Sequence, residues 1–177
     1  MRNIVPAIVS LPQYLEIQHS DPGRLRPTCC PHCGNEDLWN HGHYDRKANR
    51  KNTSNILNPI SIYRYFCPHC HKTCSTLPEC LPQNRWYLWD IQQAALMLSL
   101  IGKSFAAIEK KTMLSRHTIS RWVNHLKKHL QCHKEILCKR LVNLDITKDF
   151  PSFWVSCLDK ISLSQAMFLC HFAEVKI

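Results

Sequence analysis

The chain has 177 residues and a formal net charge of +10, which allows one ordinary domain or two small ones and favours acidic partners, above all nucleic acid. No stretch approaches the roughly 20 apolar residues of a membrane-spanning helix, so we expect no membrane partner. Eleven cysteines, an odd number that includes two Cys-x-x-Cys pairs, argue against a secreted disulfide framework and predict a metal-binding cytoplasmic protein, associated with the nucleoid.

The N-terminal residues 1–28 are rich in proline and short of helical periodicity, and Ala7 to Ile17 suggests an extended strand broken at Pro12. The sequence CPHC then occurs twice, at 30–33 and at 67–70. Each copy places two sulfurs on one tight turn, and Gly34 suits such a turn because glycine tolerates a positive φ.

The two CPHC copies together predict one structural zinc ion, Zn2+, in a closed tetrahedral site that leaves no open position for a substrate. The four expected ligands are Cys30, Cys33, Cys67 and Cys70. Two further cysteines crowd the pairs, Cys29 and Cys74, and either can be an alternative ligand.

The residues between the two pairs predict two strands, at 38–44 with a bulge or turn at Gly42 and at 60–66, joined by a polar loop at 46–58. This order is that of a zinc ribbon, in which the metal supplies most of the folding free energy because so small a sheet buries little apolar surface. A linker is expected at 77–84, where two prolines occur.

Helical patterns follow the linker. A helix is expected from Asp90 to Ile101, ended by Gly102. Ser104 can cap a short helix to Lys111, and Ser115 can cap a longer one that runs to about Leu130. A short helix, a turn and a longer helix have the spacing of a helix-turn-helix.

The last of these three helices has two distinct faces. Its apolar face comprises Ile119, Trp122, Val123, Leu126 and Leu130. Donor-rich side chains suited to base edges and phosphates occupy its first turn and its other face, namely Arg116, His117, Thr118, Ser120, Arg121, Asn124 and Lys128. An amphipathic helix pair with a solvated basic face also fits this pattern, but 11 Lys and Arg against 3 Asp and Glu in residues 82–141 favour DNA binding.

Residues 134–177 predict two or three more helices, apolar enough to support a homo-oligomer. The predicted fold class is therefore α+β, with a small N-terminal zinc-ribbon β module, an all-α helix-turn-helix region and C-terminal helices. The expected domains are 1–80, 81–132 and 133–177. The four acids after residue 144 are expected to be ordinary surface or capping residues, so no catalytic residue is predicted.

Several motifs in a fixed order carry a family resemblance: CPHCG, HGHYDRK, IYRYFCPHC, a Leu-Pro linker, GKS and SRHTISRW. From about Thr28 to Leu130 the chain resembles the N-terminal zinc-ribbon and helix-turn-helix region of bacterial insertion-sequence transposases and their accessory DNA-binding proteins. The resemblance implies that the four cysteines of the two CPHC copies bind zinc. It also implies that Arg116, His117, Thr118 and Arg121 face DNA.

A full transposase of this type carries a ribonuclease-H-like domain with three carboxylates, and the 47 residues after Leu130 are too few for one. We therefore expect a transposase-related protein without enzymatic activity that recognises double-stranded DNA at the ends of a mobile element. The alternatives are a host transcription regulator, a truncated transposase whose catalytic part is absent, and an interaction module that holds protein partners.

Overall fold

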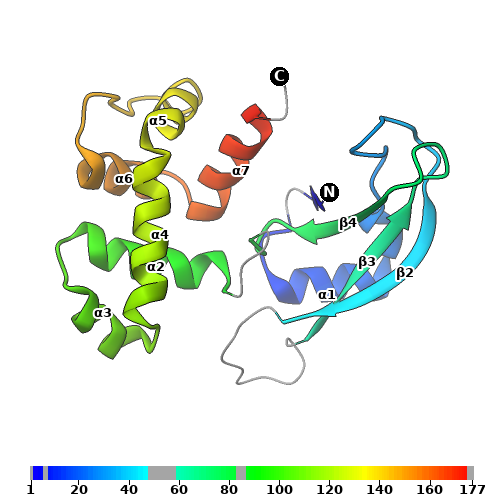
Figure 1. The fold of residues 1–177 in the computed structure, drawn as a ribbon, viewed down its shortest axis with the longest axis horizontal. Coiled ribbons are helices and arrows are strands. Elements are labelled where there is room, and N and C mark those ends of the chain that lie inside the picture. Colours follow the sequence, from blue (N-terminus) through cyan, green and yellow to red (C-terminus); the bar gives the residue numbers. More distant parts are fainter. Residues whose placement is uncertain (1, 6–7, 48–58, 83–86, 175–177) are drawn as a thin grey trace. The chain divides into compact units, whose positions relative to one another are not determined.

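The computed structural model describes residues 2–5, 8–47, 59–82 and 87–174. The chain forms two compact units, residues 1–88 and 89–177 (Figure 1). A sheet organises the first unit and helices make up the described part of the second, so the α+β class expected from the sequence is confirmed. Within the described ranges, no helix has the length and apolar character needed to cross a bilayer.

The sheet of the first unit has four strands in the order β1-β4-β3-β2. The strands are β1 (Arg2–Val5), β2 (Trp39–Arg46), β3 (Ile60–Phe66) and β4 (Thr73–Pro78). β1 pairs with β4 in parallel, and the other pairs are antiparallel. The two expected strands correspond to β2 and β3, and the pairing shifts register around Gly42, which has φ +77°. Most of the expected loop lies at 48–58, outside the described residues.

The predicted strand at 7–17 is wrong, because residues Leu11–Ser20 form helix α1. Ser10 caps this helix by accepting a hydrogen bond from the amide of Gln13. Pro12 lies in the first turn, where a proline starts a helix rather than breaking it because its missing N–H would have no partner there. A short 3-10 helix, Pro22–Leu25, follows.

The predicted linker at 77–84 is also wrong for its described part. Leu77 and Pro78 end strand β4, and Cys80 and Leu81 are buried in the core of the first unit. Proline content is a poor guide here because Pro78 is the last residue of its strand, where the lost amide donor costs little. Residues 83–86 lie outside the described part of the chain.

The first unit has two cores. In the first, side chains of α1 pack against Ile60 and Ile62 of β3 and Leu77 of β4. The second lies at the cysteine end of the sheet and contains Tyr65 and Cys74, which pair across β3 and β4. Because side chains alternate along a strand, the two cores lie on opposite faces of the sheet.

The second unit contains six helices within its described residues. These are α2 (Trp89–Leu100), α3 (Phe105–Thr112), α4 (Arg116–Lys128), α5 (Leu130–Cys138), α6 (Phe150–Leu158) and α7 (Leu163–Glu174). Helix α2 contacts α3, α4, α6 and α7, so the C-terminal helices pack into the same unit as the expected helix-turn-helix. Figure 1 shows α4 crossing α2 near the middle of this unit.

Local signals account for where these helices begin and end. Gly102, at φ +84°, ends α2 as expected. Ser104 and Ser115 cap α3 and α4 by accepting hydrogen bonds from the amides of Ala107 and Thr118, respectively.

Candidate metal centre and nucleic-acid interface

The two CPHC copies converge at one end of the sheet. The thiol sulfurs of Cys30, Cys33, Cys67 and Cys70 all lie within 4.8 Å of one another. Sγ of Cys30 is 3.7 Å from Sγ of Cys70, and Sγ of Cys33 is 3.6 Å from Sγ of Cys67. Sulfurs about 2.3 Å from a central ion at the corners of a tetrahedron are about 3.8 Å apart. The four cysteines therefore have the spacing of a four-thiolate metal site and can hold a metal ion.

The two turns that carry these sulfurs are built alike. The amide of Gly34 donates to the carbonyl of Cys30, and the amide of His71 donates to the carbonyl of Cys67. Both Gly34 and His71 have positive φ, +75° and +56°. Gly34 matches the expectation from the sequence, whereas His71 accepts a backbone strain that glycine would avoid.

Thiol acidity in this group depends on backbone donors and on the neighbouring sulfurs. Burial acts to raise the pKa of Cys30, but amide hydrogen bonds from His32 and Cys33 outweigh it, and the pKa falls to about 7. The Asn35 amide acts to lower the pKa of Cys33, yet burial and the neighbouring thiols raise it to about 12. Four thiolates so close together repel one another, and a bound cation relieves that repulsion.

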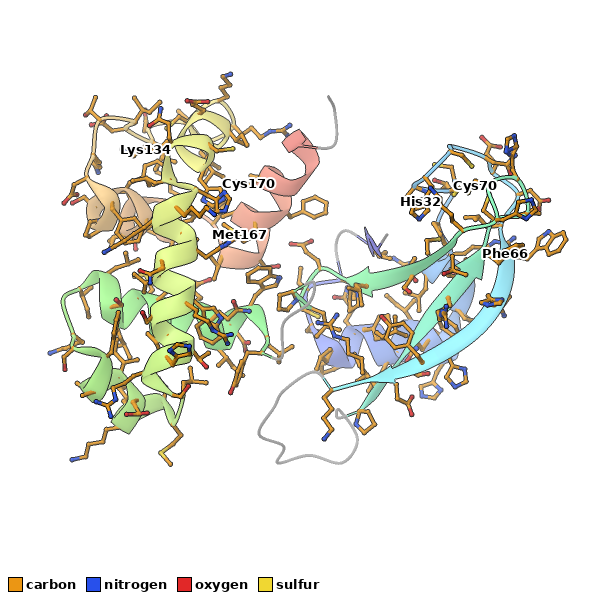
Figure 2. The ribbon with its side chains drawn as sticks, in the orientation of Figure 1. His32, Phe66, Cys70, Lys134, Met167 and Cys170 are labelled. Atoms are coloured by element: carbon orange, nitrogen blue, oxygen red, sulfur yellow. The ribbon has the colours of Figure 1, made fainter. Side chains whose placement is uncertain are left out.

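The two alternative ligands are placed differently. Cys29 is exposed and stands outside the group of four sulfurs. Cys74 is buried beside Cys30 and Cys67 in the second core, where burial raises its pKa. Cys74 therefore packs as a neutral residue against the four cysteines of the candidate metal site. Figure 2 shows Cys70 and His32 at this same end of the sheet.

Helices α3 and α4 are joined by a three-residue turn, 113–115, in a helix-turn-helix arrangement. Met113 ends α3 in the left-handed conformation, and Leu114 is buried in the turn. Glu109 of α3 accepts a hydrogen bond from the backbone amide of Arg116. Its carboxylate also forms an ion pair with the Arg116 side chain, with 2.9 Å between Nε and Oε2. This ion pair, which the sequence analysis did not identify, connects the two helices.

The apolar face of α4 is buried as expected. Its buried side chains include Ile119, Trp122, Val123 and Leu126, while Leu130 is half-buried and belongs to α5. The opposite face presents a row of exposed donors: His117, Arg121, Asn124 and Lys128. Ser120 is half-buried and accepts a hydrogen bond from Asn124. No acidic residue occurs in α4.

Two residues expected to face DNA have intramolecular roles. Thr118 is 5% exposed, and its hydroxyl shares a 2.9 Å hydrogen bond with that of Ser115. In this structure Thr118 supports the cap of α4 and is not among the exposed donors of that helix. Arg116 remains exposed, but its Nε is engaged by Glu109.

Comparison with known proteins matches part of the chain to a family. The family described as a domain of unknown function (DUF6431) matches residues 30–122, just over half of the chain. The matched region begins at the first cysteine of the metal group and ends at Trp122 within α4, so it includes all four cysteines and the first part of α4 but not Asn124 or Lys128. No curated protein and no solved structure matches the chain.

Proposed function

The chain belongs to the DUF6431 family, and from its own residues we propose that it is a DNA-binding protein of mobile-element origin that holds one structural zinc ion. Helix α4 would enter the major groove of a duplex at the ends of the element, and basic residues around it would contact phosphates. The protein would act by recognition and not by catalysis.

One observation carries this proposal: α4 is a capped helix that contains no acid and exposes a continuous row of donors. Arg121 and Asn124 belong to the residue types that pair with guanine and adenine edges, and Lys128 at the C-terminal end suits a phosphate. Nothing in the packing of the second unit requires these side chains, because they are exposed. A solvated helix face without this role would be expected to mix acids with its bases.

The zinc proposal follows from the type of ligand. Four thiolates at tetrahedral spacing favour zinc or an iron–sulfur centre over harder ions. Zinc has no redox chemistry and would hold together the two turns that carry the cysteines.

A matched pair of variants tests the proposed DNA contact. Arg121→Ala removes an arginine from the exposed row of α4, and Arg140→Ala removes an exposed arginine that follows α5. With fluorescence anisotropy on duplexes from the element end and of random sequence, Arg121→Ala should weaken element-end binding by about 1–3 kcal/mol. Arg140→Ala should change it little. Equal affinity of the wild type for both duplexes, or equal effects of the two variants, would refute sequence-specific reading by α4.

A further inference from the structure

One face of the sheet is uncovered at its cysteine end. In the pairing of the strands, Phe66 lies opposite both Trp39 and Thr73, so these three side chains share a face. Arg64, two residues before Phe66 on the same strand, belongs to this face as well. The same face is covered by α1 farther along, at Ile62, but here Trp39 is 56% exposed and the other three side chains are half-buried.

Four rings gather on this uncovered face around Phe66. The centre of its ring lies 6.2 Å from that of Trp39, 5.9 Å from that of His41 and 6.2 Å from that of His71. All three pairs are tilted, which is a favourable arrangement for aromatic rings. We call Trp39, His41, Phe66 and His71 the ring patch. Figure 2 shows Phe66 at the same end of the sheet as Cys70.

The surroundings of the ring patch suit an anionic partner. Arg64 shares its face and donates a hydrogen bond to the hydroxyl of Thr73, and the exposed Lys72 follows His71. The carboxylate of Asp45 belongs to the opposite face, because Asp45 pairs with Ser61. The acids nearest in sequence, at 36 and 37, precede the strand.

Rigid exposed rings beside a guanidinium make a stacking platform for nucleobases. Inside a duplex each base is already stacked on both sides, so apart from the terminal pairs only an unpaired base has a free face to offer. A sheet with outward-facing aromatic side chains uses this contact without needing a particular sequence.

We propose that the ring patch binds single-stranded DNA, with an unpaired base stacked on Trp39 and a phosphate near Arg64. The choice of DNA rests on the proposed function. The contact itself is additional, because α4 reads a duplex and the ring patch takes a strand that has left one. The first unit would thus bind single-stranded DNA, whereas the second unit would bind duplex DNA.

Fluorescence anisotropy of the zinc-loaded full chain on a labelled short oligothymidylate tests this proposal, with a duplex measured in parallel. Trp39→Ala should weaken binding to the single strand by about 5- to 150-fold, the range for loss of one base–aromatic stack, and leave duplex affinity unchanged. Arg121→Ala should weaken binding to the duplex and leave affinity for the single strand unchanged. Val142→Ala removes an apolar side chain that is 80% exposed in the second unit and should change neither.

Trp39→Phe keeps a stacking ring at the same position and should retain most of the affinity for the single strand, which separates stacking from a loss of folding. Unchanged affinity of Trp39→Ala for the single strand would overturn the proposal. Tighter Trp39-dependent binding to single-stranded RNA of the same composition would overturn the choice of DNA. If the protein shows no sequence preference among duplexes but still binds the single strand through Trp39, the proposed function of α4 is refuted and that of the ring patch is not.

Discussion

Replacing Cys70 and Cys74 separately with alanine distinguishes the metal site from the core beside it. Cys70 lies in the turn between β3 and β4 and has its sulfur in the group of four, whereas Cys74 lies within β4 and is a buried packing residue. Structural zinc contributes about 10–16 kcal/mol in small zinc-binding peptides, so one of four ligands accounts for about 3 kcal/mol. Cys70→Ala should therefore weaken zinc binding roughly a hundredfold.

Cys74→Ala should leave zinc binding intact and cost about 1 kcal/mol of folding free energy, because it removes one buried sulfur from the second core. Zinc content is measured by atomic emission after dialysis against a zinc buffer that competes for the metal. The wild type and Cys74→Ala should retain one zinc per chain, and Cys70→Ala should retain little. Loss of zinc from Cys74→Ala, with retention in Cys70→Ala, would show that the ligand set is wrong.

Removal of the metal should also affect the two cores of the first unit unequally. The second core, which includes Tyr65, is built around the cysteines, whereas the first core packs α1 against the sheet without them. In hydrogen exchange, a chelator should abolish protection at Tyr65 and preserve it in α1. Simultaneous loss of amide protection at Tyr65 and in α1 would mean that the metal supports the whole first unit, as expected for a minimal zinc ribbon.

Three further predictions concern the second unit. Met113→Gly should raise the free energy of unfolding by about 0.5–1 kcal/mol, because Met113 has φ +58° and is 65% exposed; chemical denaturation checks this, and a decrease would contradict it. Ser115→Ala should lower it by about 1 kcal/mol by removing the cap of α4, and no change would mean that the cap is redundant. Burial, with smaller contributions from His129 and His125, lowers the pKa of His133 from 6.5 to about 4. Between pH 6.5 and pH 4 the unfolded chain therefore binds a proton at this histidine more readily than the folded chain does. Thermal unfolding should then show stability falling by up to about 3 kcal/mol from pH 6.5 to pH 4, and His133→Leu should flatten this dependence; an unchanged slope in that variant would exclude His133 as its source.

The features that could be predicted from the sequence are those fixed by nearby residues. The caps at Ser104 and Ser115 depend on amides three residues ahead, and the turn at Gly34 depends on its own backbone freedom. The repeat of CPHC brought two distant turns to one metal group because the ligand chemistry itself requires four sulfurs.

The features that were missed depend on contacts between distant residues or on position within an element. The parallel pairing of β1 with β4 joins residues more than 70 positions apart, which no local pattern reveals. A proline in an apolar run suggests a broken strand, but the serine two residues before Pro12 is a cap signal that predicts a helix start instead. The hydrogen bonds between Thr118 and the capping Ser115 are also missing from the sequence prediction, although a polar residue three positions after a cap is placed to support that cap.

The salt dependence of duplex binding tests the central claim most directly. The observed affinity of the full chain is measured at several salt concentrations for the wild type and for Lys128→Ala, which removes an exposed lysine at the end of α4. The wild type should show affinity that falls linearly with salt on logarithmic axes, and the variant should lose about one unit of that slope. Duplex binding that is independent of salt would contradict DNA binding by α4. So would an unchanged salt slope in Lys128→Ala together with unchanged duplex affinity in Arg121→Ala.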